Sequence, residues 1–143
     1  KLPNIKFDFY GMANKQPIWA DNFIKAISNS KIALNLSQGY ASNYYTSDRF
    51  AQLIGNGLLV MIDQKTRISD FFNKDEIVTY SNINDLSKKI EKYSNDDVLR
   101  KKIAKKGRDK YFKFFNSTLI AEFIINKTFD ININKKYFWE NRG

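Results

Sequence analysis

The chain has 143 residues, a net charge of +9, and neither cysteine nor histidine. Its length is that of one domain, and the two missing residue types exclude disulfide scaffolds, thiolate nucleophiles, Ser-His-Asp catalysis and metal centres with His or Cys ligands. No apolar run approaches the roughly 20 residues that span a bilayer, and the first residues lack a signal-peptide pattern, so we expect a single cytoplasmic domain over residues 1–143 without a membrane span.

Strand and helix patterns alternate along the chain. Strands are expected near residues 5–10, 31–36, 58–62 and 76–80, where β-branched and aromatic residues gather. Helices are expected from Pro17 to Asn29, from Ser47 to Asn56, from Asn84 onward, from Asp96 to Phe115 and from Ser117 to Phe129. The continuous apolar run 58–62 is typical of a strand covered on both faces. The pattern therefore predicts an α/β protein, with a Rossmann-like open parallel sheet and helices on both faces.

The longest loop, residues 37–46, follows the second expected strand and leads into a helix. In an open parallel sheet, ligands bind at the carboxyl ends of the strands. We expect Ser47 to cap this helix, with Asp48 and Arg49 in its first turn. Backbone N–H groups and a guanidinium both attract anions, so Arg49 is a candidate phosphate-binding residue. The alternative is an ordinary surface arginine that pairs with Asp48 or Asp63.

Aromatic residues are frequent in the same loop. Tyr40, Tyr44 and Tyr45 could stack on a base or a sugar, or could simply cover the edge of the sheet. The chain lacks both a Walker-type phosphate loop and a GxGxxG motif. The acidic pairs Asp75-Glu76 and Asp96-Asp97 stand at expected element starts, where capping explains them, so we expect no metal site.

Most of the positive charge lies in residues 88–113, which hold eleven basic and four acidic side chains. A basic helix can bind nucleic acid or an anionic membrane surface. Here the lysines surround an apolar seam instead of alternating with exposed aromatics. A solvated helix face is the better interpretation, and we do not expect a nucleic-acid partner.

Six blocks of sequence follow one another in a recognisable order and spacing. They are SKIALNLS (30–37), Arg49 to Gly57, LLVMID (58–63), DFF (70–72), NDLSKKI (84–90) and LRKKIAKKGRDKYF (99–112). Together they resemble the C-terminal, donor-binding half of a GT-B glycosyltransferase of the spore-maturation-protein-like branch. The chain departs from that pattern at Ala51 and Gln52, where the family usually carries Phe and Glu.

The resemblance implies a metal-independent glycosyltransferase, or its donor-binding half, with a nucleotide sugar as substrate and no further cofactor. An N-terminal acceptor domain would then lie outside this chain. By the same resemblance the donor diphosphate would lie near Ser47, Asp48 and Arg49, and the ribose near Gln52. The pocket would be lined by Ser37, Gly39 and Tyr44. The resemblance assigns no catalytic residue to this chain.

Three functions therefore remain open. The first is sugar transfer from a nucleotide sugar. The second is a nucleotide- or anion-binding module without chemistry of its own, which the neutral Gln52 favours. The third is a basic nucleic-acid-binding domain, whose affinity would fall steeply with salt.

Overall fold

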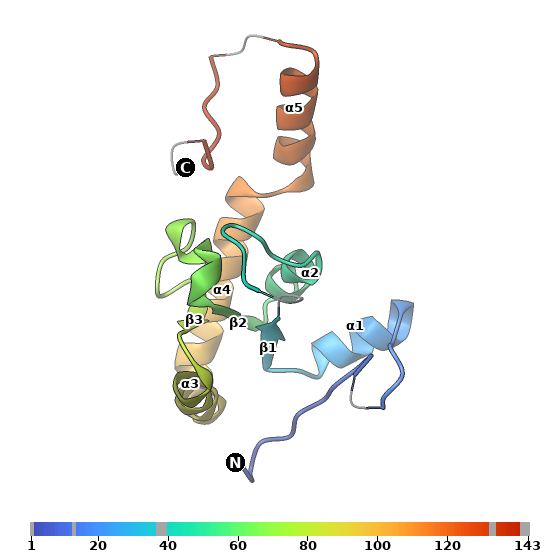
Figure 1. Ribbon diagram of the computed structural model, residues 1–143, viewed down its shortest axis with the longest axis vertical. Coiled ribbons are helices and arrows are strands. Elements are labelled where there is room, and N and C mark those ends of the chain that lie inside the picture. Colours follow the sequence, from blue (N-terminus) through green and yellow to red (C-terminus); the bar gives the residue numbers. More distant parts are fainter. Residues whose placement is uncertain (1, 13, 37–39, 132–133, 141–143) are drawn as a thin grey trace.

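The computed structural model describes residues 2–12, 14–36, 40–131 and 134–140. Its sheet consists of β1 (Ile32–Asn35), β2 (Leu59–Asp63) and β3 (Val78–Tyr80), in the order β1-β2-β3 (Figure 1). Both pairs are parallel, with Ala33 opposite Val60 and Met61 opposite Val78. The predicted parallel sheet is thus confirmed for three of its four expected strands.

Within the described residues, five helices surround or extend from this sheet. They are α1 (Ala20–Ser28), α2 (Arg49–Gly55), α3 (Ile83–Asn95), α4 (Asp97–Phe114) and α5 (Ser117–Thr128). Two short 3-10 turns, η1 (Gln64–Thr66) and η2 (Ile68–Asp70), lead from β2 towards β3.

The central strand β2 has helices on both of its faces. Val60 and Ile62 pack with Phe50 and Ile54 of α2 on one face. On the other face, residues of β2 and β3 pack with residues of α3; this second cluster includes Leu59, Met61, Val78, Leu86 and Ile90. Helix α4 contributes to both clusters. Because both faces are covered, β2 shows no polar alternation, and the fold is an open parallel α/β sheet of Rossmann-like character, consistent with one half of a GT-B fold.

The expected strand at residues 5–10 does not form. The segment is extended, since Phe7 stacks on Phe9 at 6.2 Å between ring centroids and Lys6 pairs with Asp8 at 3.3 Å, but it joins no sheet. Its composition favours β structure, yet a strand also needs a hydrogen-bonded neighbour and a buried face. Phe7 and Phe9 remain 39% and 42% exposed, so the segment has no fully buried face.

The expected starts of the first and third helices also differ from those observed. The first helix begins at Ala20 and not at Pro17, because Trp19 is in an extended conformation and Ala20 has a positive φ of 47°. Trp19, just before the helix, is 75% exposed. Helix α3 is capped by Asn82 and not by Asn84, because the extended Asn82 accepts hydrogen bonds from the backbone N–H groups of both Asn84 and Asp85.

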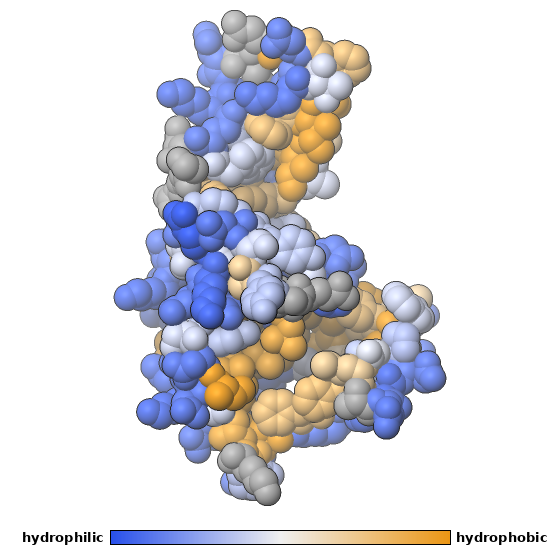
Figure 2. Space-filling view, viewed as in Figure 1, coloured by the Kyte–Doolittle hydropathy of each residue, from blue (hydrophilic) through white to orange (hydrophobic). Residues whose placement is uncertain are grey.

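Helix α5 and the tail after it extend away from the sheet (Figure 1). The tail packs on α5 through the buried Tyr137, whose hydroxyl donates to Glu122 at 3.0 Å, and through Lys135, which pairs with Glu122 at 2.7 Å. The opposite side of α5 exposes a band of apolar side chains that Figure 2 shows in orange. By helical spacing it includes Ile120 and Ile124, and Ile125 and Phe129 nearby are also exposed. No helix among the described residues is long and apolar enough to cross a membrane.

Candidate functional site

The carboxyl ends of the three parallel strands share one edge of the sheet. At the end of β1, Asn35 is only 3% exposed and accepts a hydrogen bond from the hydroxyl of Ser47 at 2.6 Å. This bond holds the residues before α2 over the end of β1. Ser47 was expected to cap the helix with its side chain, but Asp48 does so, accepting from the Arg49 N–H at 3.1 Å. The Ser47 hydroxyl is engaged by Asn35 instead.

The start of α2 is a weaker anion site than the sequence indicates. Helix α2 has only seven residues, so its dipole is small, and the Asp48 carboxylate already lies at its positive end. Any anion affinity must therefore come mainly from side chains. Arg49 and Gln52 lie one turn apart on α2, and both are exposed. Within the described part of the chain, Arg49 forms no ion pair with Asp48, with Asp63 or with any other acid.

The loop after β1 contacts the turn after β2 through Tyr44. The Tyr44 N–H donates to the carbonyl of Thr66 at 2.7 Å, and the Tyr44 hydroxyl donates to Asp70 at 3.1 Å. Arg67 donates to the same carboxylate from Nε at 3.0 Å and from Nη2 at 2.7 Å. Its guanidinium also lies 5.0 Å from the centre of the Tyr44 ring. Desolvation and the hydrogen bond to Asp70 raise the pKa of the Tyr44 phenol.

The three tyrosines of this loop differ in their surroundings. Tyr44 is half-buried and packs edge-on against Phe71, with ring centroids 5.3 Å apart, so it covers the edge of the sheet. Tyr40 is 96% exposed and Tyr45 is 49% exposed. Of the residues expected to line the pocket, Ser37 and Gly39 lie outside the described residues.

The turn after β2 presents a second cation. The Asp63 carboxylate accepts from the Lys65 N–H at 2.8 Å, and the fully buried Thr66 donates its hydroxyl to the Asp63 carbonyl at 2.7 Å. These bonds fix the backbone while the Lys65 side chain stays exposed, with no ion pair to any described residue. Sequence reasoning missed Lys65. The available signal was its place two residues after an aspartate that ends a buried strand.

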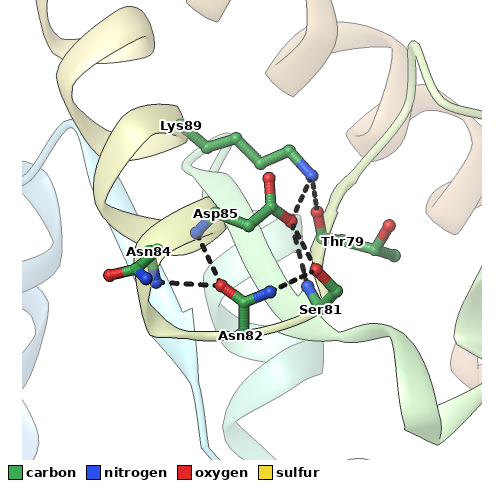
Figure 3. A network of polar contacts seen from close by, with 6 residues as sticks. All are labelled: Thr79, Ser81, Asn82, Asn84, Asp85 and Lys89. Atoms are coloured by element: carbon green, nitrogen blue, oxygen red, sulfur yellow. Dashed lines mark hydrogen bonds and ion pairs between the residues drawn. The ribbon is translucent and has the colours of Figure 1, made fainter.

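Polar residues also gather where β3 ends and α3 begins (Figure 3). Lys89 donates to the Thr79 carbonyl at 2.7 Å and to the Asp85 carboxylate at 2.8 Å. Asp85 in turn accepts from the N–H of Ser81 at 3.0 Å. The hydrogen bond from Lys89, followed by the one from Ser81, lowers the pKa of Asp85. The network holds the first turn of α3 against the end of β3. Because Lys89 already donates to two oxygens of the protein, it is not available to a ligand.

The basic helix is largely a solvated face, as expected. Lys101, Lys102, Lys105 and Lys106 are exposed, whereas Ile103 is buried and Leu99 is half-buried.

The acidic pair Asp75-Glu76 was expected to cap an element. It forms ion pairs with lysines of α4 instead. Asp75 forms an ion pair with Lys106, and Glu76 forms one with Lys110 at 2.6 Å in which both side chains are mostly buried. Part of the local positive charge is therefore neutralised within the fold. By contrast, Asp96 caps α4 as expected, accepting from the Leu99 N–H at 2.9 Å.

The carboxyl edge carries the exposed cations Arg49 and Lys65. Among the residues that the structure describes, no three acidic side chains come together as a possible metal site. The hollows of the surface formed by the described residues include an open groove along α5 beside Ser117, Ala121 and Ile125, and a smaller one beside Phe72 and Thr79. The edge itself is defined by Asn35, Asp63 and the two segments that follow them.

The three-stranded parallel sheet with helices on both faces defines an open α/β fold, a class in which ligands bind at the carboxyl edge of the sheet. A family model described as "Glycosyl transferase-like" matches residues 1–126, and the chain therefore belongs to this glycosyl transferase-like family. No curated protein and no solved structure gives a significant match.

Proposed function

We propose that this domain binds a nucleotide-sugar donor at the carboxyl edge of its sheet and serves the transfer of the sugar to an acceptor without a metal ion. The observation that carries this proposal is Arg49, an exposed guanidinium without an acidic partner among the described residues, at the carboxyl edge of the sheet in a glycosyl transferase-like domain. The six blocks of sequence described above support its placement in the spore-maturation-protein-like branch.

The proposed roles follow from charge and position. Transfer breaks the bond between the sugar and the diphosphate, and the leaving diphosphate gains negative charge. Arg49 and Lys65 would stabilise that charge, since cations placed where charge develops lower the barrier. The Arg49 fork matches phosphate oxygens in two-point contact. Ser47 and Asp48 would contribute by holding the backbone at this point, because the Asp48 carboxylate itself repels an anion.

Gln52 is the proposed ribose contact. It lies one turn after Arg49, is exposed, and can both donate to and accept from a diol. Tyr44 would form one wall of the pocket. A second, acceptor-binding domain would face the same edge and supply the group that takes the proton from the acceptor hydroxyl.

Calorimetric titration with a panel of nucleoside diphosphates and nucleotide sugars tests the proposal. Arg49→Ala should weaken binding by about 1.5–3 kcal/mol, the range for a hydrogen bond to a charged group. Arg49→Lys should fall between the wild type and Arg49→Ala, because it keeps the charge but loses the planar fork. Gln52→Glu should leave the affinity for the nucleotide unchanged or raise it if the residue contacts the ribose.

The matched control is Arg108→Ala. Arg108 is also exposed, but it donates to the carbonyl of Gly55 at the other end of α2, so its removal should leave nucleotide affinity unchanged. Equal affinity of the wild type and Arg49→Ala would refute the site. A wild-type domain that binds no member of the panel would refute the function.

The second candidate is a nucleotide-binding module without transferase chemistry. It is favoured by Gln52, which places a neutral amide where the family usually has a carboxylate. Nucleotide binding would then persist with Arg49 in the same role. Incubation with the preferred nucleotide sugar would release no sugar and no free nucleoside diphosphate, even with an acceptor-binding domain and acceptor present.

A further inference from the structure

The segments after β1 and β2 both contain a residue in an unusual backbone conformation. Tyr44 has a φ of 61° and Arg67 a φ of 56°. Side chains other than glycine rarely adopt this left-handed region, and such residues persist only where the surroundings hold them. Here the two residues hold each other, because the Arg67 guanidinium lies over the Tyr44 ring.

Asp70 completes the cluster from the second 3-10 turn. Its carboxylate accepts from the Tyr44 hydroxyl and from two nitrogens of Arg67. The Tyr44–Asp70 bond joins residues 26 positions apart in the sequence. One carboxylate therefore ties the loop after β1 to the turn after β2.

The residues of the cluster are close in sequence to Arg49 and Lys65, the two cations of the proposed site. Tyr44 is three residues before Ser47, whose hydroxyl binds Asn35, so the segment 44–47 is fixed at both ends. Arg49 follows directly after this segment. Lys65 lies directly before Thr66, whose carbonyl accepts the Tyr44 N–H.

We propose that Tyr44, Arg67 and Asp70 are positioning residues, which set Arg49 and Lys65 at the spacing that a donor diphosphate requires. This inference rests on the proposed function and adds to it a determinant of affinity outside the diphosphate contacts. Arg67 is itself a cation at this edge, but its guanidinium is engaged by Asp70. Its role is thus to orient the two segments and not to contact phosphate.

If these residues served only the stability of the fold, their loss would lower the unfolding midpoint in urea, and the positioning role predicts otherwise. The Arg67 and Asp70 side chains are 52% and 32% exposed, and ion pairs this accessible contribute little to global stability. Loss of the cluster should therefore leave the unfolding midpoint in urea nearly unchanged. Nucleotide affinity and the protection of residues 40–48 against hydrogen exchange should fall.

The experiment compares Asp70→Asn, Tyr44→Phe and Asp70→Glu with the wild type in nucleoside diphosphate affinity, urea unfolding and hydrogen exchange. Asp70→Asn should weaken binding roughly two- to thirty-fold, the range for residues that act through a network. Tyr44→Phe keeps the ring over Arg67 and against Phe71 and loses only the hydroxyl, so its loss should be smaller. Asp70→Glu should recover part of the affinity.

The control is Asp109→Asn, which removes an exposed ion pair with Lys105 on α4. It should change neither affinity nor exchange at residues 40–48. Equal nucleotide affinity of the wild type and Asp70→Asn, or an equal loss in the Asp109→Asn control, would overturn the positioning role while leaving the proposed function intact. A wild-type domain that binds no nucleotide would overturn both.

Discussion

The two edges of the sheet differ in the burial and ion pairing of their arginines and lysines. At the amino edge, Arg100 is 7% exposed and bridges from α4 to the start of β1, donating to Asp97 at 3.0 Å and to the Lys31 carbonyl at 3.4 Å. At the carboxyl edge, Arg49 and Lys65 are exposed and lack an acidic partner among the described residues. Arg100 is paired and ties α4 to β1, whereas Arg49 and Lys65 stand without a described acidic partner at the edge where a parallel sheet binds its ligands, beside the paired Arg67 and Lys89.

The largest expected effect concerns the close approach of α4 to the chain before β3, at the amino edge. A Cβ added at Gly107 would lie 2.1 Å from the Glu76 carbonyl oxygen, and neither backbone can move without disturbing the core. Gly107→Ala should cost about 3 kcal/mol of unfolding free energy or more, measured by urea denaturation. The control is Gly55→Ala, where the nearest atom is 3.8 Å away and belongs to a side chain. Equal stabilities of the two variants would show that the approach is not tight.

The next effect separates the two arginines directly. Arg100→Met keeps the apolar stem but loses the buried hydrogen bonds, so it should cost about 1.5–3 kcal/mol of stability and leave nucleotide affinity unchanged. Arg49→Met should change stability by less than about 0.5 kcal/mol, as for an exposed side chain, and should weaken nucleotide binding. Urea unfolding and calorimetry on the same two variants check both expectations. An equal loss of stability in Arg100→Met and Arg49→Met would contradict the difference between the two arginines.

Acid should weaken the amino edge in a predictable direction. The Arg100 guanidinium, and then the Lys31 ammonium, hold the pKa of Asp97 below its ordinary value of 3.8. A carboxylate with a lowered pKa in the folded state contributes stability above that ordinary value, and the contribution is lost as the pH falls through the lowered pKa.

Asp97→Asn should therefore be less stable than the wild type near about pH 6, and the difference should shrink towards about pH 3. Urea titrations at both pH values measure it. Asp21→Asn, which removes an exposed carboxylate without an ion pair among the described residues, controls for the change in net charge. A stability difference between the wild type and Asp97→Asn that stays constant with pH would show that folding does not lower the pKa of Asp97.

The smallest effect is expected on the solvated face of α4. Lys101 and Lys102 are exposed and form no ion pair with a described residue. The double variant Lys101→Gln, Lys102→Gln should change the unfolding free energy by less than about 1 kcal/mol and should leave nucleotide affinity unchanged. A loss of nucleotide binding would mean that this helix, and not the carboxyl edge alone, contacts the ligand.

The sequence predicted those parts of the fold whose determinants are local. The run of apolar residues at 58–62 marked β2 because both faces of that strand are buried. The seam at Ile103 and the cap at Asp96 marked α4. The segment 5–10 had the same β-rich composition, but composition does not say whether a neighbouring strand is available.

The candidate site was predictable only in part. Arg49 stood out because it is an arginine after a long loop, and the structure places it at the expected edge. The contacts of Tyr44 with Arg67 and Asp70 left no signal in the sequence, because they join segments more than twenty residues apart through backbone conformations that propensity does not favour. Lys65 was missed because its one signal, its place two residues after Asp63, is hard to distinguish in a chain with many lysines.

The position of α4 in the chain has a consequence for synthesis on the ribosome. Both apolar clusters need residues of α4: Ile103 and Ala104 for one, and Tyr111, with Phe115 just after the helix, for the other. The sheet begins at Ile32, so β1 is made long before the helix that closes the core. At usual elongation rates the intervening chain takes on the order of ten seconds to emerge. From the synthesis of β2 until α4 has emerged, this apolar strand is uncovered on at least part of each face, so we expect the core to close only once α4 has been made.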